Sequence, residues 1–166
     1  MSIAKGLLAE VEHEAKATRD LLARVPDKPD WRPHPKSMAL GRLAGHIAEL
    51  PGWGSMILTQ DVFVLDPTKH TPRQVKTGRE AADSFDKDLA AFKAALAPRT
   101  DAEMLKTWKM VVGDRTVMEM PRNVVIRNMI LNHTIHHRAQ LGVYLRMNEV
   151  KLPQTYGPSA DEGSMI

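Results

Sequence analysis

The sequence predicts an all-α protein in which four helices pack together as one domain, residues 1–166. Four separate segments repeat apolar residues at the spacing of a helix, and only one short stretch alternates in the way that a strand does. Prolines lie between these segments, where a helix has to end. A chain of this length buries about 70% of its unfolded surface, which is enough for one core.

The first helix is expected from Ser2 to Val25, because apolar side chains recur there at every third or fourth position. Ser2 is a suitable N-cap, since its hydroxyl can accept from a backbone N–H of the first turn. The stretch from Pro26 to Pro35 holds four prolines and therefore predicts a loop. Trp31 lies inside this loop, and we expect its ring to close one end of the bundle.

A second helix is expected from a cap at Ser37 to about Leu58, with a kink at Pro51, which removes one backbone hydrogen bond. The following stretch, Gln60 to Lys76, shows no helical period and is long for a connection inside a compact domain. A crossover along the bundle accounts for this length, because it lets the second and third helices run in the same direction.

The third helix is expected to begin at Thr77, which forms the pattern of a capping box with Glu80, and to end before Pro98. Between Trp108 and Met120 apolar residues alternate on both sides of Gly113-Asp114, a pair that favours a turn. The pattern therefore predicts a small β-hairpin before the last helix.

Pro121 suits the first turn of the last helix, which is expected to run to about Met147. The tail from Leu152 to Ile166 is rich in proline, glycine and serine, so we expect it to be irregular.

The composition excludes several kinds of function. The chain has no cysteine, which excludes disulfides, cysteine zinc sites and a cysteine nucleophile, so that any thiol chemistry needs a thiol from a co-substrate. A net charge of +3 and 5% aromatic residues do not give the basic, aromatic surface that binds nucleic acid. No apolar run is long enough for a membrane span and no secretory signal is visible, which favours a cytoplasmic protein.

Two histidines of the last helix are candidate metal ligands. At about 100° per residue they share one face with apolar side chains: Ile126, Ile130, His133, His137, Leu141 and Tyr144. Spacing of i and i+4 is the one by which a helix offers two imidazoles to one metal ion. The alternative is a pair of core histidines, but both nitrogens of each ring would then need partners in a low-dielectric interior. His136 points away from this face and is better placed at the rim.

His46 lies beside the apolar stripe of the second helix and can supply a third imidazole. Three histidines leave positions open for water or substrate, which is typical of catalytic sites, where a bound water is acidified toward a pKa of ~7. Glu49, one turn from His46, is either a base, a group behind the ligand or a solvated carboxylate.

The remaining polar residues offer weaker evidence of a role in the site. Gln140 and Tyr144 follow His137 on nearly the same face, and they either line the site or pack at its rim. We assign no role to the other three histidines: His13 and His34 are expected at the surface, and His70 lies in the predicted crossover.

The run from Asn132 to Leu141 resembles the H-x-x-H-H-R-x-Q signature of the DinB-like metal-binding proteins, a family unrelated to the DNA polymerase of the same name. The segment from Ser37 to Ile47 resembles the first-histidine region of that family, and the tail from Tyr156 to Glu162 resembles its C-terminal end. The likeness spans the chain, although Ala139 stands where glycine is common.

The resemblance implies a four-helix bundle in which His46, His133 and His137 hold one divalent ion, nickel or zinc above all. Family members are often homodimers, and a second, partly apolar stripe on the opposite side of the last helix agrees with this: Val124, Leu131, Ile135 and Gly142.

Related proteins include S-transferases and a maleylpyruvate isomerase that use thiols such as mycothiol or bacillithiol. The resemblance therefore implies a metal-dependent enzyme, a thiol S-transferase or a hydrolase, whose partner is a small-molecule substrate or a low-molecular-weight thiol. The alternative is a non-catalytic metal-binding or stress-response protein in which the ion only stabilises the fold. A fourth protein ligand would favour this alternative.

Overall fold

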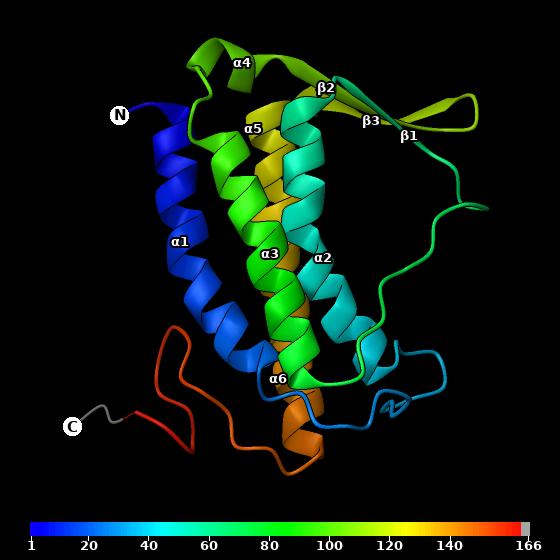
Figure 1. The fold of residues 1–166 in the computed structure, drawn as a ribbon, viewed down its shortest axis with the longest axis vertical. Coiled ribbons are helices and arrows are strands. Elements are labelled where there is room, and N and C mark those ends of the chain that lie inside the picture. The colour runs from blue at the N-terminus through cyan, green and yellow to red at the C-terminus, as the bar shows by residue number, and fades with distance from the viewer. Residues whose placement is uncertain (164–166) are drawn as a thin grey trace.

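The computed structural model describes residues 1–163 and shows a mostly helical protein with a small sheet at one end (Figure 1). The long helices are α1 (Ile3–Leu22), α2 (Leu40–Thr59), α3 (Gly78–Leu96) and α6 (His133–Met147). They pack side by side, with α2 in contact with both α3 and α6, and α1 in contact with α3 and α6. The predicted helices are therefore present, although the last one is interrupted in a way that the sequence did not reveal.

The last helical segment begins as α5 (Arg122–Val125), continues as the π-helix η1 (Ile126–Asn132) and only then becomes α6. A π-helix bonds residue i to i+5, so that its turns are wider than those of an α-helix. The angular count that placed Leu131 on an outer stripe fails across these wider turns. Leu131 is 4% exposed and belongs to the core.

The predicted hairpin is present and is extended by a third strand. β2 (Thr107–Val112) pairs antiparallel with β3 (Arg115–Pro121), and Gly113 takes a positive φ in the turn between them. β1 (Val62–Leu65), which lies in the stretch without helical period and was not predicted from the sequence, pairs parallel with β2. A short helix, α4 (Asp101–Leu105), was also not expected.

The helix caps agree only in part with the predictions. Ser2 caps α1 by accepting from Lys5 N, and Thr77 caps α3 by accepting from Glu80 N. Glu80, however, accepts from Lys76 N and does not complete a box with Thr77. The predicted cap at Ser37 is wrong, because α2 begins at Leu40 after Ala39, which makes no side-chain cap hydrogen bond. The helix continues through Pro51 to Thr59.

The segment 60–77 leaves the end of α2 beside the sheet and returns along the molecule to the start of α3 at the other end, so that both helices rise in Figure 1. Part of it lies directly on α2. A Cβ added at Gly41 would lie 2.3 Å from the carbonyl oxygen of Val75, and one at Gly45 would lie 2.4 Å from that of Arg73. Only glycine permits so close an approach of two backbones.

The apolar interior forms two clusters. The one next to the sheet includes Trp108, Phe92 and Leu131, and the one at the opposite end includes Leu22, Leu43 and Leu141, with Trp31 packed against it as expected. Along the last helix the first cluster ends at Leu131 and the second begins at Leu141. The histidines His133 and His137 therefore occupy the gap between the two clusters.

The tail is irregular from Leu152 as far as the structure describes it, and the end of the predicted tail and domain, residues 164–166, lies outside the described residues. Within residues 1–163, none of the helices combines the length and the apolar character that a membrane crossing requires.

Candidate metal centre

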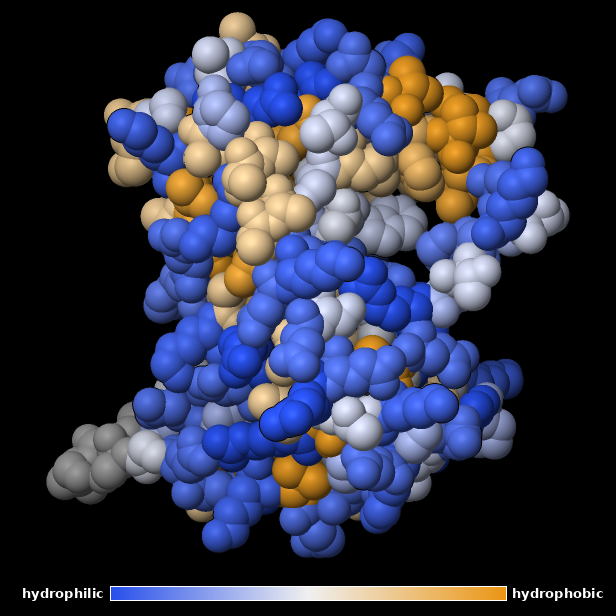
Figure 2. Space-filling model, viewed as in Figure 1, coloured by the Kyte–Doolittle hydropathy of each residue, from blue (hydrophilic) through white to orange (hydrophobic). Residues whose placement is uncertain are grey.

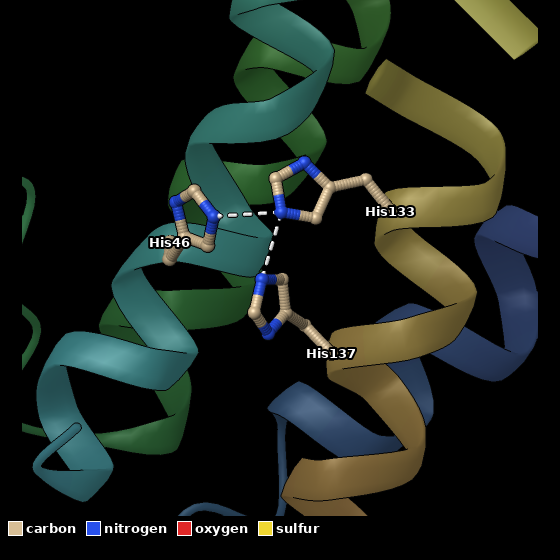
Figure 3. Close-up of side chains that lie close together, drawn as sticks. All are labelled: His46, His133 and His137. Atoms are coloured by element: carbon tan, nitrogen blue, oxygen red, sulfur yellow. Dashed lines mark hydrogen bonds between the residues drawn. The ribbon is translucent and has the colours of Figure 1, made fainter. Parts of the chain in front are cut away.

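Three histidine side chains from two helices converge on one point (Figure 3). His46 comes from α2, and His133 and His137 come from consecutive turns of α6. Nε2 of His133 lies 3.3 Å from Nε2 of His46 and 2.8 Å from Nε2 of His137. All three candidate ligand atoms lie within 4.8 Å of one another. The structure therefore brings together the three residues that the sequence singled out.

The other ring nitrogen of His46 and of His137 faces away from this point and has an acceptor. Nδ1 of His46 lies 2.9 Å from Oε1 of Glu49, and Nδ1 of His137 lies 2.7 Å from Oε1 of Gln140. His133 bonds to the backbone of Met129. A carboxylate and a carbonyl only accept, so a neutral His46 or His137 ring carries its proton on Nδ1. The guanidinium of Arg42 is also 3.4 Å from Nδ1 of His46, but the shorter bond to an ionised carboxylate dominates.

Burial lowers the pKa of two of the three rings, those of His133 and His137, and so favours their neutral forms. Burial lowers the pKa of His137 to about 4, an effect that its hydrogen bond to Gln140 opposes and the neighbouring histidines reinforce. Burial and the neighbouring His46 also lower the pKa of His133. Neutral imidazoles with the proton on Nδ1 direct an Nε2 lone pair at the common point, and this is the form that coordinates a metal ion.

Glu49 is buried rather than solvated, so of the readings left open for this residue the solvated carboxylate is wrong. Its carboxylate accepts from His46, from Arg42 at 3.2 Å and from the backbone N–H of Arg73 at 3.2 Å. Burial alone would raise the pKa of Glu49, but the bond from His46 and the charge of Arg42 together lower it. Spacing of i and i+3 from His46 was the available sequence signal. The hydrogen bond from the backbone N–H of Arg73 could not be predicted from the local sequence, because Arg73 lies 24 residues further along the chain.

The remaining candidates fall at the rim or outside the site. His136 is exposed, with its ring 4.8 Å from that of His137, and Gln140 proves to be a direct partner of His137. Tyr144 donates to the carbonyl of Met38 and packs edge-on against Trp31, away from the histidines. His13 and His34 are exposed, as expected, and His70 is exposed in the segment between α2 and α3.

The donor set fits a divalent ion. Imidazole nitrogen suits zinc, nickel, copper and iron, and three converging nitrogens are the protein contribution to an open site. In the part of the chain that the structure describes, no carboxylate and no fourth histidine joins the group of three. The side chain of His46 keeps 16% of its surface exposed, whereas His137 is 8% exposed.

Comparison with known proteins agrees with this fold. The chain matches the family model described as the DinB family over residues 1–164. It is 28% identical to the uncharacterized protein YrdA of Bacillus subtilis (strain 168) over an alignment of 153 residues, which covers 91% of this chain and 86% of that protein. It shares its fold with a DinB-like protein from Bacillus cereus ATCC 10987, with a TM-score of 0.68, 24% identity and coverage of 92% of this chain and 97% of the other. It also shares its fold with the DinB-like protein YjoA of Bacillus subtilis, with a TM-score of 0.68, 16% identity and coverage of 90% of this chain and 97% of the other.

Proposed function

Because the chain belongs to the DinB family, we propose that it binds one divalent metal ion through Nε2 of His46, His133 and His137, and that it is a metal-dependent enzyme. One observation carries the proposal. Nε2 of His133 lies 3.3 Å from Nε2 of His46 and 2.8 Å from Nε2 of His137, and Nδ1 of His46 and of His137 each has an acceptor, so these two rings direct an Nε2 lone pair toward His133. Nitrogens that close together need a proton or a cation between them, and one cation can serve all three at once.

Nickel and zinc are the ions we propose first. Three neutral imidazoles suit both, and the chain offers no cysteine that would favour a softer ion. When bound, such an ion would supply Lewis acidity, which lowers the pKa of a water or a thiol at an open position.

The residues around the site then have defined tasks. The three histidines hold the ion, while Glu49 and Gln140 fix the orientation and proton position of two of the rings. The chain has no cysteine of its own, so a thiol that reacts here has to be a small co-substrate. We therefore propose an S-transferase that uses a low-molecular-weight thiol, or a hydrolase that uses water.

The alternative is a metal that only stabilises the protein. The burial of His137, which is 8% exposed, and the position of the site between two core clusters favour it. The absence of a fourth ligand from residues 1–163 favours the enzyme, because structural zinc sites almost always have four protein ligands.

Two features of the assembly belong to the same proposal. We describe the arrangement of α1, α2, α3 and the last helical segment as a four-helix bundle with a crossover between α2 and α3, which the path in Figure 1 supports. We also propose a homodimer through the outer face of the last helix, where Val124 and Val143 are 37% and 59% exposed.

The test is elemental analysis of tag-free protein that has never met a metal-affinity column, beside the variant His133→Ala/His137→Ala. We expect near-stoichiometric divalent metal in the parent and its loss in the variant. A parent that arrives empty and takes up neither zinc nor nickel on reconstitution contradicts the proposal. If metal is present, turnover with a thiol and an electrophile that chelators abolish separates the enzyme from the structural alternative.

A further inference from the structure

We propose that Glu49 and Arg73 couple the metal centre to the long connection between α2 and α3, so that metal binding and docking of residues 73–75 on α2 strengthen each other. This inference rests on the metal site proposed above. It makes the connection, whose middle has no regular structure, part of the support of the site, and it assigns Glu49 as a positioning residue for His46.

Glu49 uses its two oxygens in two directions. Oε1 accepts from Nδ1 of His46 at 2.9 Å and from Arg42 at 3.2 Å. Oε2 accepts from the backbone N–H of Arg73 at 3.2 Å. The whole residue is 6% exposed, so water competes little for either oxygen. One buried carboxylate therefore joins a candidate ligand to the backbone of the connection.

The side chain of Arg73 holds that backbone in place. Its guanidinium donates to Asp88 at 2.7 Å and to Ser84 at 2.8 Å, both on α3, and to the carbonyl of Ala48 on α2 at 3.3 Å. The carbonyl of Arg73 accepts from Arg42 at 3.2 Å and lies directly over Gly45. Residue 73 is thus fixed between α2 and α3, one hydrogen bond away from Glu49.

The coupling follows from the polarity of this chain of bonds. A cation on Nε2 of His46 draws electron density from the ring and makes Nδ1–H a stronger donor. Glu49 is then held more firmly, and because its carboxylate is rigid, a bond that orients one oxygen also keeps the second oxygen aimed at the backbone N–H of Arg73. Carboxylates behind a metal-ligating histidine act in this way on metal affinity. Thermodynamic reciprocity requires the docked connection to favour metal binding by the same factor.

The same connection contains a matched control. The backbone N–H of Lys76 donates to Oε2 of Glu80 at 2.8 Å, which is the same kind of bond, but Glu80 lies on the first turn of α3 and has no contact with His46. We would measure amide hydrogen exchange by ¹⁵N NMR with and without zinc, which is diamagnetic. We expect zinc to slow exchange at Arg73 by about 5-fold or more and to leave Lys76 unchanged.

Two isosteric variants complete the test. Glu49→Gln is expected to weaken zinc binding by about 10- to 100-fold, measured by competition with a chromophoric chelator, and Glu80→Gln is expected to bind as the parent does. At saturating zinc, Glu49→Gln should also lose the slowing at Arg73. The comparison of the parent with and without zinc needs no variant, so a Glu49→Gln protein that fails to fold does not remove the test.

The outcomes separate the two proposals. If the parent binds zinc but Arg73 exchanges at an unchanged rate, or if Glu49→Gln binds zinc as tightly as the parent, the coupling is refuted and the metal site stands. If the parent binds neither zinc nor nickel in the titration, the metal site itself is refuted, and the coupling with it.

Discussion

Replacing Gly45 by alanine should destabilise the protein, although alanine is the better helix former. Gly45 lies inside α2, where the substitution by itself would stabilise by about 0.5–1 kcal/mol. The new Cβ, however, would lie 2.4 Å from the carbonyl oxygen and 2.9 Å from the carbonyl carbon of Arg73. These are backbone atoms, and Arg73 is tied to Glu49 and Asp88, so the contact cannot relax by a side-chain rotation.

Overpacking of this kind costs about 1–3 kcal/mol, which exceeds the gain in helix propensity. The net expectation for metal-free Gly45→Ala is a loss of about 1–2 kcal/mol, or a fall in Tm of about 2–4 °C for each kcal/mol. The matched control is Gly6→Ala in α1, where a Cβ meets nothing within 4 Å, and it should stabilise the protein.

Urea denaturation of the parent and both variants measures the change in unfolding free energy, which should be a loss for Gly45→Ala and a gain for Gly6→Ala. Gly45→Ala should in addition weaken zinc binding, since residue 73 can no longer lie on α2 as it does in the parent. If Gly45→Ala stabilises the protein as much as Gly6→Ala does, the connection is not packed against α2 in solution, and the reasoning about its docking is refuted.

Three further predictions concern the site and the buried charges. Chelation should lower the Tm of metal-loaded parent and leave His133→Ala/His137→Ala unchanged; an equal fall in both would contradict the site. The pKa of His137 is about 4 in the folded protein and 6.5 in the unfolded chain, so the unfolded chain binds more protons and the stability of the metal-free protein should fall as pH drops from 6.5 toward 4. A denaturant midpoint that stays constant through that window in the parent, or falls equally in His137→Ala, would oppose this. Arg138→Ala leaves Glu14 without its buried partner and should cost about 3–5 kcal/mol. Arg127→Ala removes a half-exposed pair with Glu10 and should cost less than about 1 kcal/mol in the same urea assay, so similar losses would show that burial does not set the cost.

The parts of the fold that depend on local patterns could be predicted from the sequence. Helical period located α1, α2 and α3, and the alternation around Gly113 located the hairpin. β1 was missed because a strand of four residues is too short to show a period, and its partner β2 begins 45 residues after it, Val62 to Thr107. The π-helix was missed because no residue type marks it; the choice between i+4 and i+5 bonding depends on what packs against the helix.

The candidate site divides in the same way. His133 and His137 are one turn apart in the same helix, so their common direction could be predicted from spacing alone. The pairing with His46 required the additional inference that two helices face each other, and the resemblance to a family supported it. The burial of Glu49 depends on Arg73, which is 24 residues further along the chain, and a long-range contact of this kind leaves no local trace.

The position of the histidines between two apolar clusters bears on whether a bound metal would serve catalysis or only stabilise the fold. Where α2 meets α6, the molecule has a layer of closely spaced imidazole nitrogens between the two apolar clusters. A bound ion turns the same layer into a cross-link, and at a concentration of 100 Kd it would stabilise the folded state by about 2.7 kcal/mol. An enzyme and a structural metalloprotein therefore give the same rise in Tm on loading. The property that would separate them is the number of ligands: an ion held by three imidazoles would keep a position for a molecule that the protein does not supply, whereas structural zinc sites almost always have four protein ligands.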